Sequence, residues 1–286
     1  MPNRDSPSQR RDRPVLDAGA VLAWGVPRLR DLPWRATRDP WSILAAEIML
    51  QQTQALRVVP KWEAFMARYP TATVCASASL GDVLRDWHGL GYPRRARNLH
   101  EAAAAMVERH RGQVPDDLAA LLALPGVGPY TARAVLAFAF ERDVAVVETN
   151  IARVLARTAG QRLTARSVQA AADALVPRGE GWVWNQVLMD LGATVCRPSP
   201  RCDECPVARS CGWRRAGKAA PDPAHGSAGV STTQAPYVGS DRQARGAVLR
   251  RLLDGARSAD EFPPRIVDGL VEDRLVVRSG GLIHLP

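Results

Sequence analysis

Apolar positions recur at helical spacing through the first two thirds of the chain. Between residues 15 and 215 they fall three or four positions apart, in segments separated by glycine, proline and short polar residues. Alternating β-branched residues are scarce in this range, which argues against a central sheet. The pattern predicts an all-α region. The segments predicted to be helical, some of them as helix pairs, are 17–29, 39–70, 80–110, 115–142, 148–160 and 167–196.

Local signals divide some of these segments further. Residues 39–70 are predicted to be two helices that meet near Pro60, with Asp39 or Ser42 as the N-cap of the first. Residues 80–110 are predicted to be a helix, a glycine turn and a long helix. Residues 115–142 are predicted to be a helix, a hairpin and a second helix.

The composition changes after residue 215. Residues 216–240 are rich in Ala, Pro, Gly and Ser and are predicted to be a linker. Residues 241–286 show three helical patterns and then the hairpin pattern LVVRSGGLIHL, which together predict a small winged-helix-like module. Residues 1–14 are predicted to be a disordered basic tail, either a solvated end or a weak, non-specific DNA contact. The predicted globular core is therefore 15–215.

The charge of the chain indicates a polyanionic partner. The 286 residues carry a formal net charge of +9, supplied almost wholly by arginine. A basic protein of this kind prefers nucleic acid. No apolar run reaches the roughly 18 residues of a membrane helix, and the N-terminus lacks the apolar region of a secretory signal. We therefore expect no membrane association and a cytoplasmic, nucleoid-associated protein.

Four of the five cysteines lie close together. Cys75 stands alone in an apolar stretch and is predicted to fill the core. The others have the spacing C-x5-C-x2-C-x5-C, which gives one compact set of soft sulfur ligands. Zinc sites commonly pair two C-x2-C arms, and only one is present here, so the spacing favours a [4Fe–4S] cluster over zinc. The predicted ligands are Cys196, Cys202, Cys205 and Cys211.

The stretch LPGVGPYTARA, residues 124–134, places Gly-Val-Gly directly before a helix. One interpretation is a tight turn between two helices. The other is a phosphate-binding site formed by the backbone. Glycine lets the phosphate approach the backbone closely, and a helix N-terminus presents free N–H groups and the positive end of the helix dipole.

Six stretches resemble the MutY-type adenine glycosylases, a family of the helix-hairpin-helix superfamily that includes endonuclease III. The resemblance covers residues 15–215, and MLQQTQ is its most discriminating part. The matching stretches are LPWR (32–35), AEIMLQQTQ (46–54), GLGYPRRARNLH (89–100), LPGVGPYTARA (124–134), ETNIARVLAR (148–157) and MDLGATVC (189–196).

The resemblance implies a two-lobed all-α helix-hairpin-helix fold with a [4Fe–4S] loop at 196–211. It also implies a monomer that acts on double-stranded DNA. The enzyme would flip adenine out of a mispair with 8-oxoguanine or guanine and excise it.

The resemblance assigns catalysis to two carboxyls that converge on one extruded nucleoside. Glu47 matches the general acid that protonates adenine N7 and later activates water. Its sequence neighbours are apolar, which argues against a plain surface glutamate. Desolvation in such a setting raises the pKa of a carboxyl. Glu148 stands where the family has a catalytic aspartate, whose ionised form stabilises the oxocarbenium. The extra methylene moves the carboxylate by about 1.5 Å, enough to cost around a hundredfold in rate. Glu148 is also placed to cap the helix that follows.

The remaining matched residues support catalysis or contact DNA. Tyr130 and Asn150 match positions around the flipped nucleotide and the water. Bifunctional enzymes of the endonuclease III type carry a lysine where this chain has Tyr130, so no Schiff base forms there and the implied enzyme is monofunctional. Arg153, one helical turn after Asn150, is placed to orient Glu148. The residues expected to contact DNA are Gln52 and Tyr92 as wedges beside the orphan base, Arg94 and Arg95 at phosphates, Gly126, Val127 and Gly128 in the hairpin, and Arg153.

Three departures from the family keep alternatives open. Five residues separate the first two cluster cysteines, where the family commonly has six. The C-terminal region is too short for a Nudix-like domain and lacks a Phe-Ser-His loop, so the preference for 8-oxoguanine is open. Glu148 leaves room for a thymine or uracil mismatch glycosylase on the same scaffold. A non-enzymatic DNA-binding protein is the third alternative.

Overall fold

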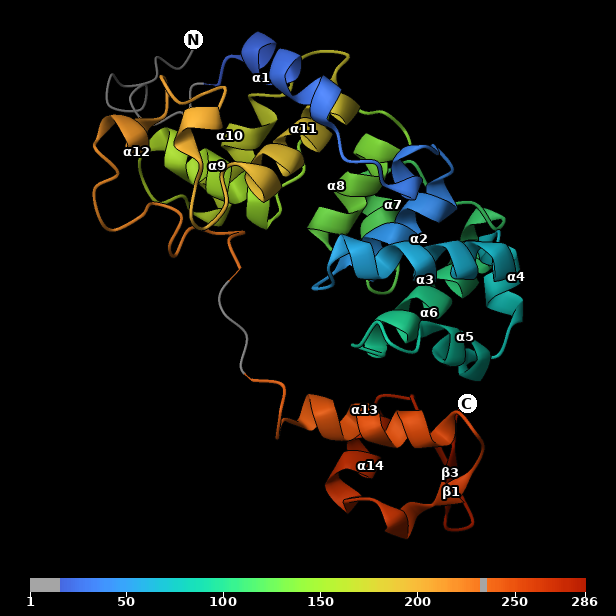
Figure 1. The fold of residues 1–286 in the computed structure, drawn as a ribbon. Helices are drawn as coiled ribbons and strands as arrows, with labels where there is room; N and C mark the ends of the chain where they lie inside the picture. The colour runs from blue at the N-terminus through green and yellow to red at the C-terminus, as the bar shows by residue number, and fades with distance from the viewer. Residues whose placement is uncertain (1–15, 232–235) are drawn as a thin grey trace, which may run out of the picture. The chain divides into compact units, whose positions relative to one another are not determined.

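The computed structural model describes residues 16–231 and 236–286, and its internal contacts divide the chain into two compact units (Figure 1). The first unit combines the chain up to Asp31 with 136–232, and the second combines 32–135 with 233–286. The basic tail predicted at 1–14 lies outside the described residues. No helix among the described residues is long and apolar enough to cross a membrane.

The first unit is built around two helices that pack on each other, α9 and α11. Trp184 and Leu191 of α11 and Leu155 of α9 are fully or almost fully buried between them. The predicted helices at 17–29, 148–160 and 167–196 are confirmed within this unit. Its helices are α1 (Ala18–Gly25), η1 (Val26–Arg28), α9 (Thr149–Ala159), α10 (Ala165–Asp173), α11 (Gly181–Thr194), η3 (Cys202–Glu204) and α12 (Gly212–Arg215).

The second unit is organised around α2, whose residues from Trp41 to Met49 are all buried. The ring of Phe65 packs on the rings of Tyr69 and Trp87, at centroid distances of 4.7 and 6.4 Å respectively. Its helices within 32–135, with α8 running on to Phe138, are η2 (Pro33–Arg35), α2 (Pro40–Leu50), α3 (Ala55–Arg68), α4 (Ala72–Ser77), α5 (Leu80–Trp87), α6 (Arg94–His110), α7 (Leu118–Leu122) and α8 (Pro129–Phe138).

The junction between α2 and α3 is not at Pro60, where the sequence pattern placed it. Pro60 lies inside α3, and the chain turns instead at residues 51–54, where Gln52 has a positive φ of 55°. Pro60 is the sixth residue of α3, where it removes one backbone hydrogen bond while the helix continues. A left-handed residue such as Gln52 instead turns the chain out of the helix.

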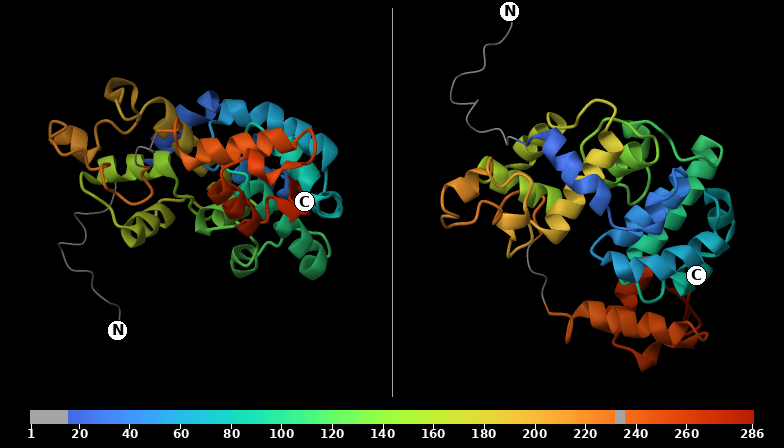
Figure 2. Two further views of the ribbon diagram at one scale, coloured as in Figure 1. Left: turned by 90° about the horizontal axis from the view of Figure 1, so that it is seen from below. Right: turned by 45° about the horizontal axis from the view of Figure 1, so that its top comes forward.

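Residues 241–286 form a small module that packs with 32–135 in the second unit (Figure 2). Two helices cover a three-stranded antiparallel sheet of order β1-β3-β2, the only sheet among the described residues. The middle of the three predicted helices is a single 3-10 turn, and the two-residue strand β1 was not predicted. The elements are α13 (Asp241–Leu252), β1 (Arg257–Ser258), η4 (Ala259–Glu261), α14 (Pro264–Glu272), β2 (Val277–Ser279) and β3 (Leu282–His284).

The segment 216–231, which was expected to belong to a linker, packs against α9 in the first unit. Asp222 forms an ion pair with Arg157 at 2.6 Å, and Ala224 and Ser227 are buried. The Ala228 N–H donates to the carbonyl of Leu163. Small residues are typical of linkers, but they also let a chain without regular structure lie close to a helix. Residues 232–235 lie outside the described part.

Candidate functional site

Glu47 lies in the buried helix α2, and its carboxyl meets the hydroxyl of Tyr130. Asp39 caps this helix through the Ser42 N–H at 2.7 Å, with Pro40 at its first position, which confirms the predicted start. The Glu47 side chain is 4% exposed, and the Tyr130 hydroxyl donates to its Oε2 at 2.9 Å. The structure thus brings together two residues that the sequence placed in one active site. The carboxyl is shielded from bulk water and held by a neutral donor.

The Gly-Val-Gly turn joins α7 to α8 and presents its backbone at the N-terminus of α8. Gly126 has a φ of 76°, and a Cβ added there would lie 2.6 Å from the Cβ of Asn98. The side chain of Val127 is buried and anchors the turn. A Cβ added at Gly128 would meet nothing within 4 Å. The open side of this turn, at a helix N-terminus, is suited to an approaching phosphate.

Gln52 and Tyr92, the two predicted wedge residues, share an unusual backbone conformation. Their φ angles are 55° and 47°, in the left-handed region that non-glycine residues seldom occupy. Gln52 stands in the turn after α2, and Tyr92 stands two residues before α6. Both line the same groove in the second unit. Such strain persists where the surrounding structure enforces it, often at functional sites.

The adjacent arginines Arg94 and Arg95 have different surroundings. Arg94 is exposed, and its Nε donates to Asp273 at 2.7 Å. Arg95 is 7% exposed, and burial lowers the pKa of its guanidinium to about 10. The prediction that Arg95 contacts a phosphate does not fit this environment. Its guanidinium instead donates to backbone carbonyls in two segments and to one hydroxyl. The carbonyls are those of Ile48, Met49 and Gln51 at and after the end of α2 and of Leu90 and Gly91 before α6, and the hydroxyl is that of Thr53.

Glu148 caps helix α9 and is held by three hydrogen bonds. Its Oε1 accepts from the N–H groups of Asn150 and Ile151 at 2.8 and 2.9 Å, and its Oε2 accepts from the Asn150 amide at 3.0 Å. Burial raises the pKa of the carboxyl above its ordinary value, although these donors and nearby Arg153 favour the charged form. The expected cap is confirmed, and the side chain is rigidly oriented.

Arg153 ties Asn150 to the cysteine loop. Its guanidinium donates to the Asn150 side-chain oxygen at 2.6 Å and to the carbonyls of Gly192 and Cys196 at 2.7 and 2.6 Å. A Cβ at Gly192 would lie 2.5 Å from the Cβ of Asn150, so only glycine allows α11 this close. Arg153 therefore positions Asn150, and through it the carboxylate of Glu148.

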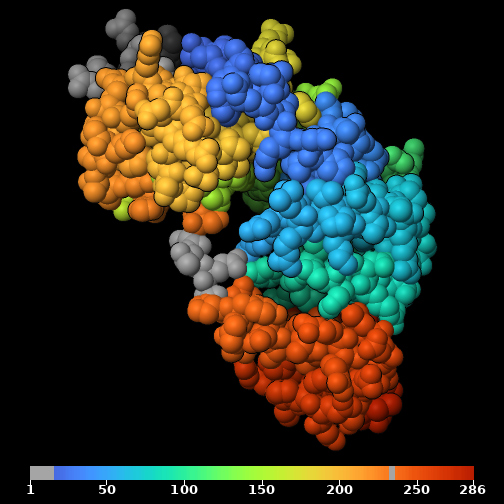
Figure 3. Space-filling view, viewed as in Figure 1, coloured from blue at the N-terminus to red at the C-terminus, as the bar shows by residue number. Residues whose placement is uncertain are grey.

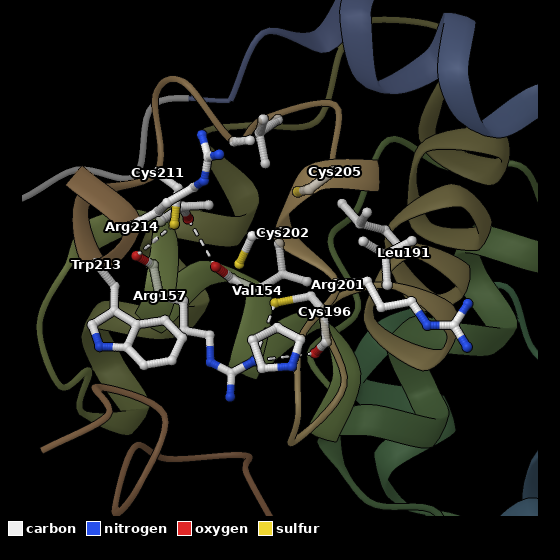
Figure 4. Close-up of a pocket in the computed structure, with 15 residues that line it drawn as sticks. Val154, Arg157, Leu191, Cys196, Arg201, Cys202, Cys205, Cys211, Trp213 and Arg214 are labelled. Atoms are coloured by element: carbon white, nitrogen blue, oxygen red, sulfur yellow. Dashed lines mark hydrogen bonds between the residues drawn. The ribbon is translucent and has the colours of Figure 1, made fainter. Parts of the chain in front are cut away.

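The four predicted ligand cysteines line one small cavity beside α9 and α11 (Figure 4). The rest of the lining is largely apolar and includes Val154, Leu191 and Val195. Among the residues that the structure describes, no three His, Cys, Asp or Glu side chains are arranged to hold a single metal ion. One zinc ion at about 2.3 Å from each sulfur requires thiols about 3.8 Å apart. The four thiols lie around one cavity and are soft ligands of the kind that metal centres take.

Arg157, a residue that the sequence pattern did not single out, braces this loop. Its guanidinium donates to the carbonyls of Arg197 and Pro198 at 2.6 and 2.9 Å and reaches the Cys196 sulfur at 3.5 Å. It also stacks over the ring of Trp213, 4.7 Å from the centroid. The available signal was its spacing, since Arg157 follows Arg153 by one helical turn and shares its face.

Comparison with known proteins agrees with this fold and with the hairpin. The model of the HhH-GPD superfamily of base excision DNA repair proteins matches residues 45–178. An adenine DNA glycosylase of Mycobacterium tuberculosis is 43% identical over 308 residues, which cover 98% of this chain and 96% of that protein.

Two further relatives match a shorter part of the chain. A thymine/uracil-DNA glycosylase of Methanothermobacter thermautotrophicus is 33% identical over 210 residues, covering 71% of this chain and 95% of that protein. The solved structure of a thermostable thymine-DNA glycosylase superposes with a TM-score of 0.66 at 30% identity, covering 74% of this chain and 100% of that one. The chain belongs to the adenine DNA glycosylases of the HhH-GPD superfamily.

Proposed function

We propose that this protein is a monofunctional glycosylase that excises adenine mispaired with 8-oxoguanine or guanine in double-stranded DNA. The observation that carries the proposal is the buried pair of Glu47 and Tyr130 in a chain of the adenine glycosylase family. A carboxyl kept from bulk water beside a flipped base is suited to general acid catalysis. No lysine stands at position 130 to form a Schiff base with the sugar.

Glu47 acts first as an acid and then as a base. Its proton goes to N7 of the flipped adenine as the bond between the sugar C1′ and the base breaks, so that the base leaves neutral. The resulting carboxylate takes a proton from water, whose oxygen forms the new bond to C1′. Tyr130 holds the carboxyl in one orientation through its hydroxyl. The products are free adenine and an abasic site.

Glu148 supplies negative charge while the sugar carries positive charge as an oxocarbenium ion. The N-terminus of α9 and the Asn150 amide orient its carboxylate. Because the charged form is required, the burial that raises its pKa works against the reaction at low pH.

We further propose that the hairpin and the wedge residues hold the duplex. The backbone at Gly126, Val127 and Gly128 approaches a phosphate, while Gln52 and Tyr92 enter the base stack. Arg94 is the exposed arginine that remains for a second phosphate. A monomer suffices for these contacts.

The four cysteines Cys196, Cys202, Cys205 and Cys211 would hold a [4Fe–4S] cluster. When bound, its iron atoms bond the four thiolates and fix the loop. Arg157 and Arg153 connect that loop to α9.

A panel of duplexes tests the proposal. The protein is incubated with duplexes that carry A opposite 8-oxoguanine, A opposite G, T opposite G and U opposite G, and alkali then cleaves any abasic site. We expect breaks at adenine only, and only after alkali. Breaks at T or U alone would support the second candidate, a mismatch thymine/uracil glycosylase, which the similarity to such enzymes favours. Tight binding without breaks would indicate a non-enzymatic DNA-binding protein.

A further inference from the structure

The C-terminal module, residues 241–286, docks on the helices of the second unit through specific contacts. The Gly81 N–H donates to the carbonyl of Pro286 at 2.8 Å, and a Cβ at Gly81 would lie 2.3 Å from that oxygen. Arg274 pairs with Glu101 at 2.9 Å, and Asp273 pairs with both Arg94 and Arg245. Only glycine fits at position 81 while the module is docked, so the docked position is built into the sequence.

The module lies against the helices of 32–135 in the second unit (Figure 3). The two together line a groove of about 880 Å³. One side contains Gln52 and Tyr92, and the other is formed by α13 and the residues before it. This volume is within the range of sites that hold small molecules and is sufficient for a nucleotide. Hereafter we call it the module groove.

The charges lining the module groove are predominantly positive. Five arginines and one aspartate line it, and that aspartate, Asp241, is paired with Arg265. Two of the arginines, Arg94 and Arg245, share the single carboxylate of Asp273, and the other three are Arg57, Arg242 and Arg250. The pKa of His88, which also lines the groove, is lowered by burial and by the positive charges of Lys61 and Arg250. A phosphodiester chain complements this potential.

Two tyrosine rings accompany these charges. Arg242 Nη1 donates to the Tyr92 hydroxyl at 2.9 Å, and its guanidinium lies 6.0 Å from the ring centroid of Tyr237. Tyr237 is 52% exposed. Basic grooves with accessible aromatic rings are typical of sites that track a nucleic-acid strand and stack its unpaired bases.

We propose that the module groove extends the DNA-binding surface beyond Gln52 and Tyr92 onto the module, where Arg242 and Arg250 contact the phosphodiester backbone and Tyr237 stacks on an unstacked base. The module is then a wall of the DNA site. This inference rests on the proposed function only in taking DNA as the ligand.

The test measures the affinity of the full-length protein for an undamaged duplex as a function of salt concentration. Removing one arginine that binds a phosphate lowers the slope of log K against log salt by about 0.9, equivalent to roughly fivefold in Kd at about 0.15 M. We expect this change for Arg242→Ala and again for Arg250→Ala. The matched control is Arg251→Ala, because Arg251 neighbours Arg250 on α13 but pairs with Glu261 outside the groove. Slopes for both groove variants equal to that of Arg251→Ala would overturn the proposal.

A duplex with one unpaired base tests the stacking contact. Tyr237→Leu should weaken the affinity of the protein for this duplex by at least about fivefold. Tyr237→Phe keeps the aromatic ring and should bind this duplex like the wild type. Equal binding by the two variants would refute the stacking contact.

A second variant distinguishes a docked module that contributes to DNA binding from a docked module that blocks the DNA-binding surface. Gly81→Ala places a methyl group against Pro286 and should displace the module, while alanine favours helix α5 itself. We expect weaker DNA binding with an unchanged circular dichroism spectrum. Tighter binding would show that the docked module covers the DNA surface and would overturn the inference. Adenine release by the wild-type protein is a separate readout, so failure of the proposed function is distinguishable from failure here.

Discussion

At the scale of single residues, Glu148 combines a structural and a chemical role. Its carboxylate caps α9 through two backbone N–H groups, a task that aspartate performs equally well. The same carboxylate is proposed to face the developing positive charge on the sugar. The cap fixes its direction, and the additional methylene of glutamate fixes how far it reaches.

Substitutions at position 148 separate charge from length. Glu148→Gln keeps the size and removes the charge, and we expect adenine excision to fall by at least about a hundredfold. Glu148→Asp keeps both charge and cap and should retain or improve the rate. Single-turnover excision measures both variants. A glutamine variant near the wild-type rate would remove Glu148 from the mechanism.

The raised pKa of Glu148 also affects stability. A carboxyl whose pKa is higher in the folded state than in the unfolded state stabilises the fold most when it is protonated, at pH below the unfolded value. That contribution disappears as pH rises through the folded pKa. The free energy of unfolding of the wild type, relative to Glu148→Gln, should therefore fall as the pH rises above about 4, the ordinary pKa of a glutamate carboxyl. Urea titrations at several pH values measure this difference; a constant difference would contradict the assignment.

Contacts between residues close in sequence could be predicted, and contacts between residues far apart in sequence could not. The caps at Asp39 and Glu148 depend on residues two or three positions away, and both could be predicted. Arg95 was predicted to contact a phosphate because it lies in GLGYPRRARNLH, one of the stretches that resemble the family. Its carbonyl partners in α2 are 46 and 47 positions distant, and no local pattern identifies them.

At the scale of secondary-structure elements, the end of α2 determines where its site residues lie. The last carbonyls of a helix have no intrahelical donor. Arg95 satisfies the carbonyls of Ile48 and Met49 and also that of Gln51, next to Gln52. One side chain thus satisfies the end of the helix that carries Glu47 and holds the turn of Gln52, which is proposed to act as a wedge.

Arg95→Met should lower the free energy of unfolding by about 2–4 kcal/mol, because several buried carbonyls lose their donor. The matched control is Arg94→Met on the preceding position of α6. Its exposed pair with Asp273 is worth about 1 kcal/mol or less. Chemical denaturation compares the two. Similar decreases for both would contradict the capping role of Arg95.

The elements themselves were largely predictable, with two instructive exceptions. The hairpin before α8 followed from Gly-Val-Gly, since Gly126 has the positive φ that the turn requires. The helix break assigned to Pro60 was wrong because the left-handed Gln52 ends α2 first. Residues 216–231 resembled a linker, because their composition does not reveal that Asp222 pairs with Arg157.

At the scale of the whole molecule, the cysteine loop and the C-terminal module join segments far apart in sequence. Gly81 meets Pro286 at the far end of the chain, and nothing in the local sequence predicts that contact. The four cysteines could be recognised as a set because their spacing is local. The roles of the arginines that brace them came only from the structure.

The proposed [4Fe–4S] cluster can be tested by spectroscopy. The purified protein should absorb near ~400 nm and contain about four iron atoms per chain. Cys202→Ser should lose this absorbance, while Cys75→Ala, at a buried cysteine outside the loop, should keep it. A protein with one zinc per chain and no such absorbance would contradict the cluster assignment.

The most direct test of the account compares adenine release by the wild type and by Glu47→Gln on a duplex with A opposite 8-oxoguanine, at saturating protein, with free adenine measured by chromatography. We expect the wild type to release adenine and Glu47→Gln to release almost none while it binds the duplex and melts like the wild type. Release at the wild-type rate by Glu47→Gln would contradict the account.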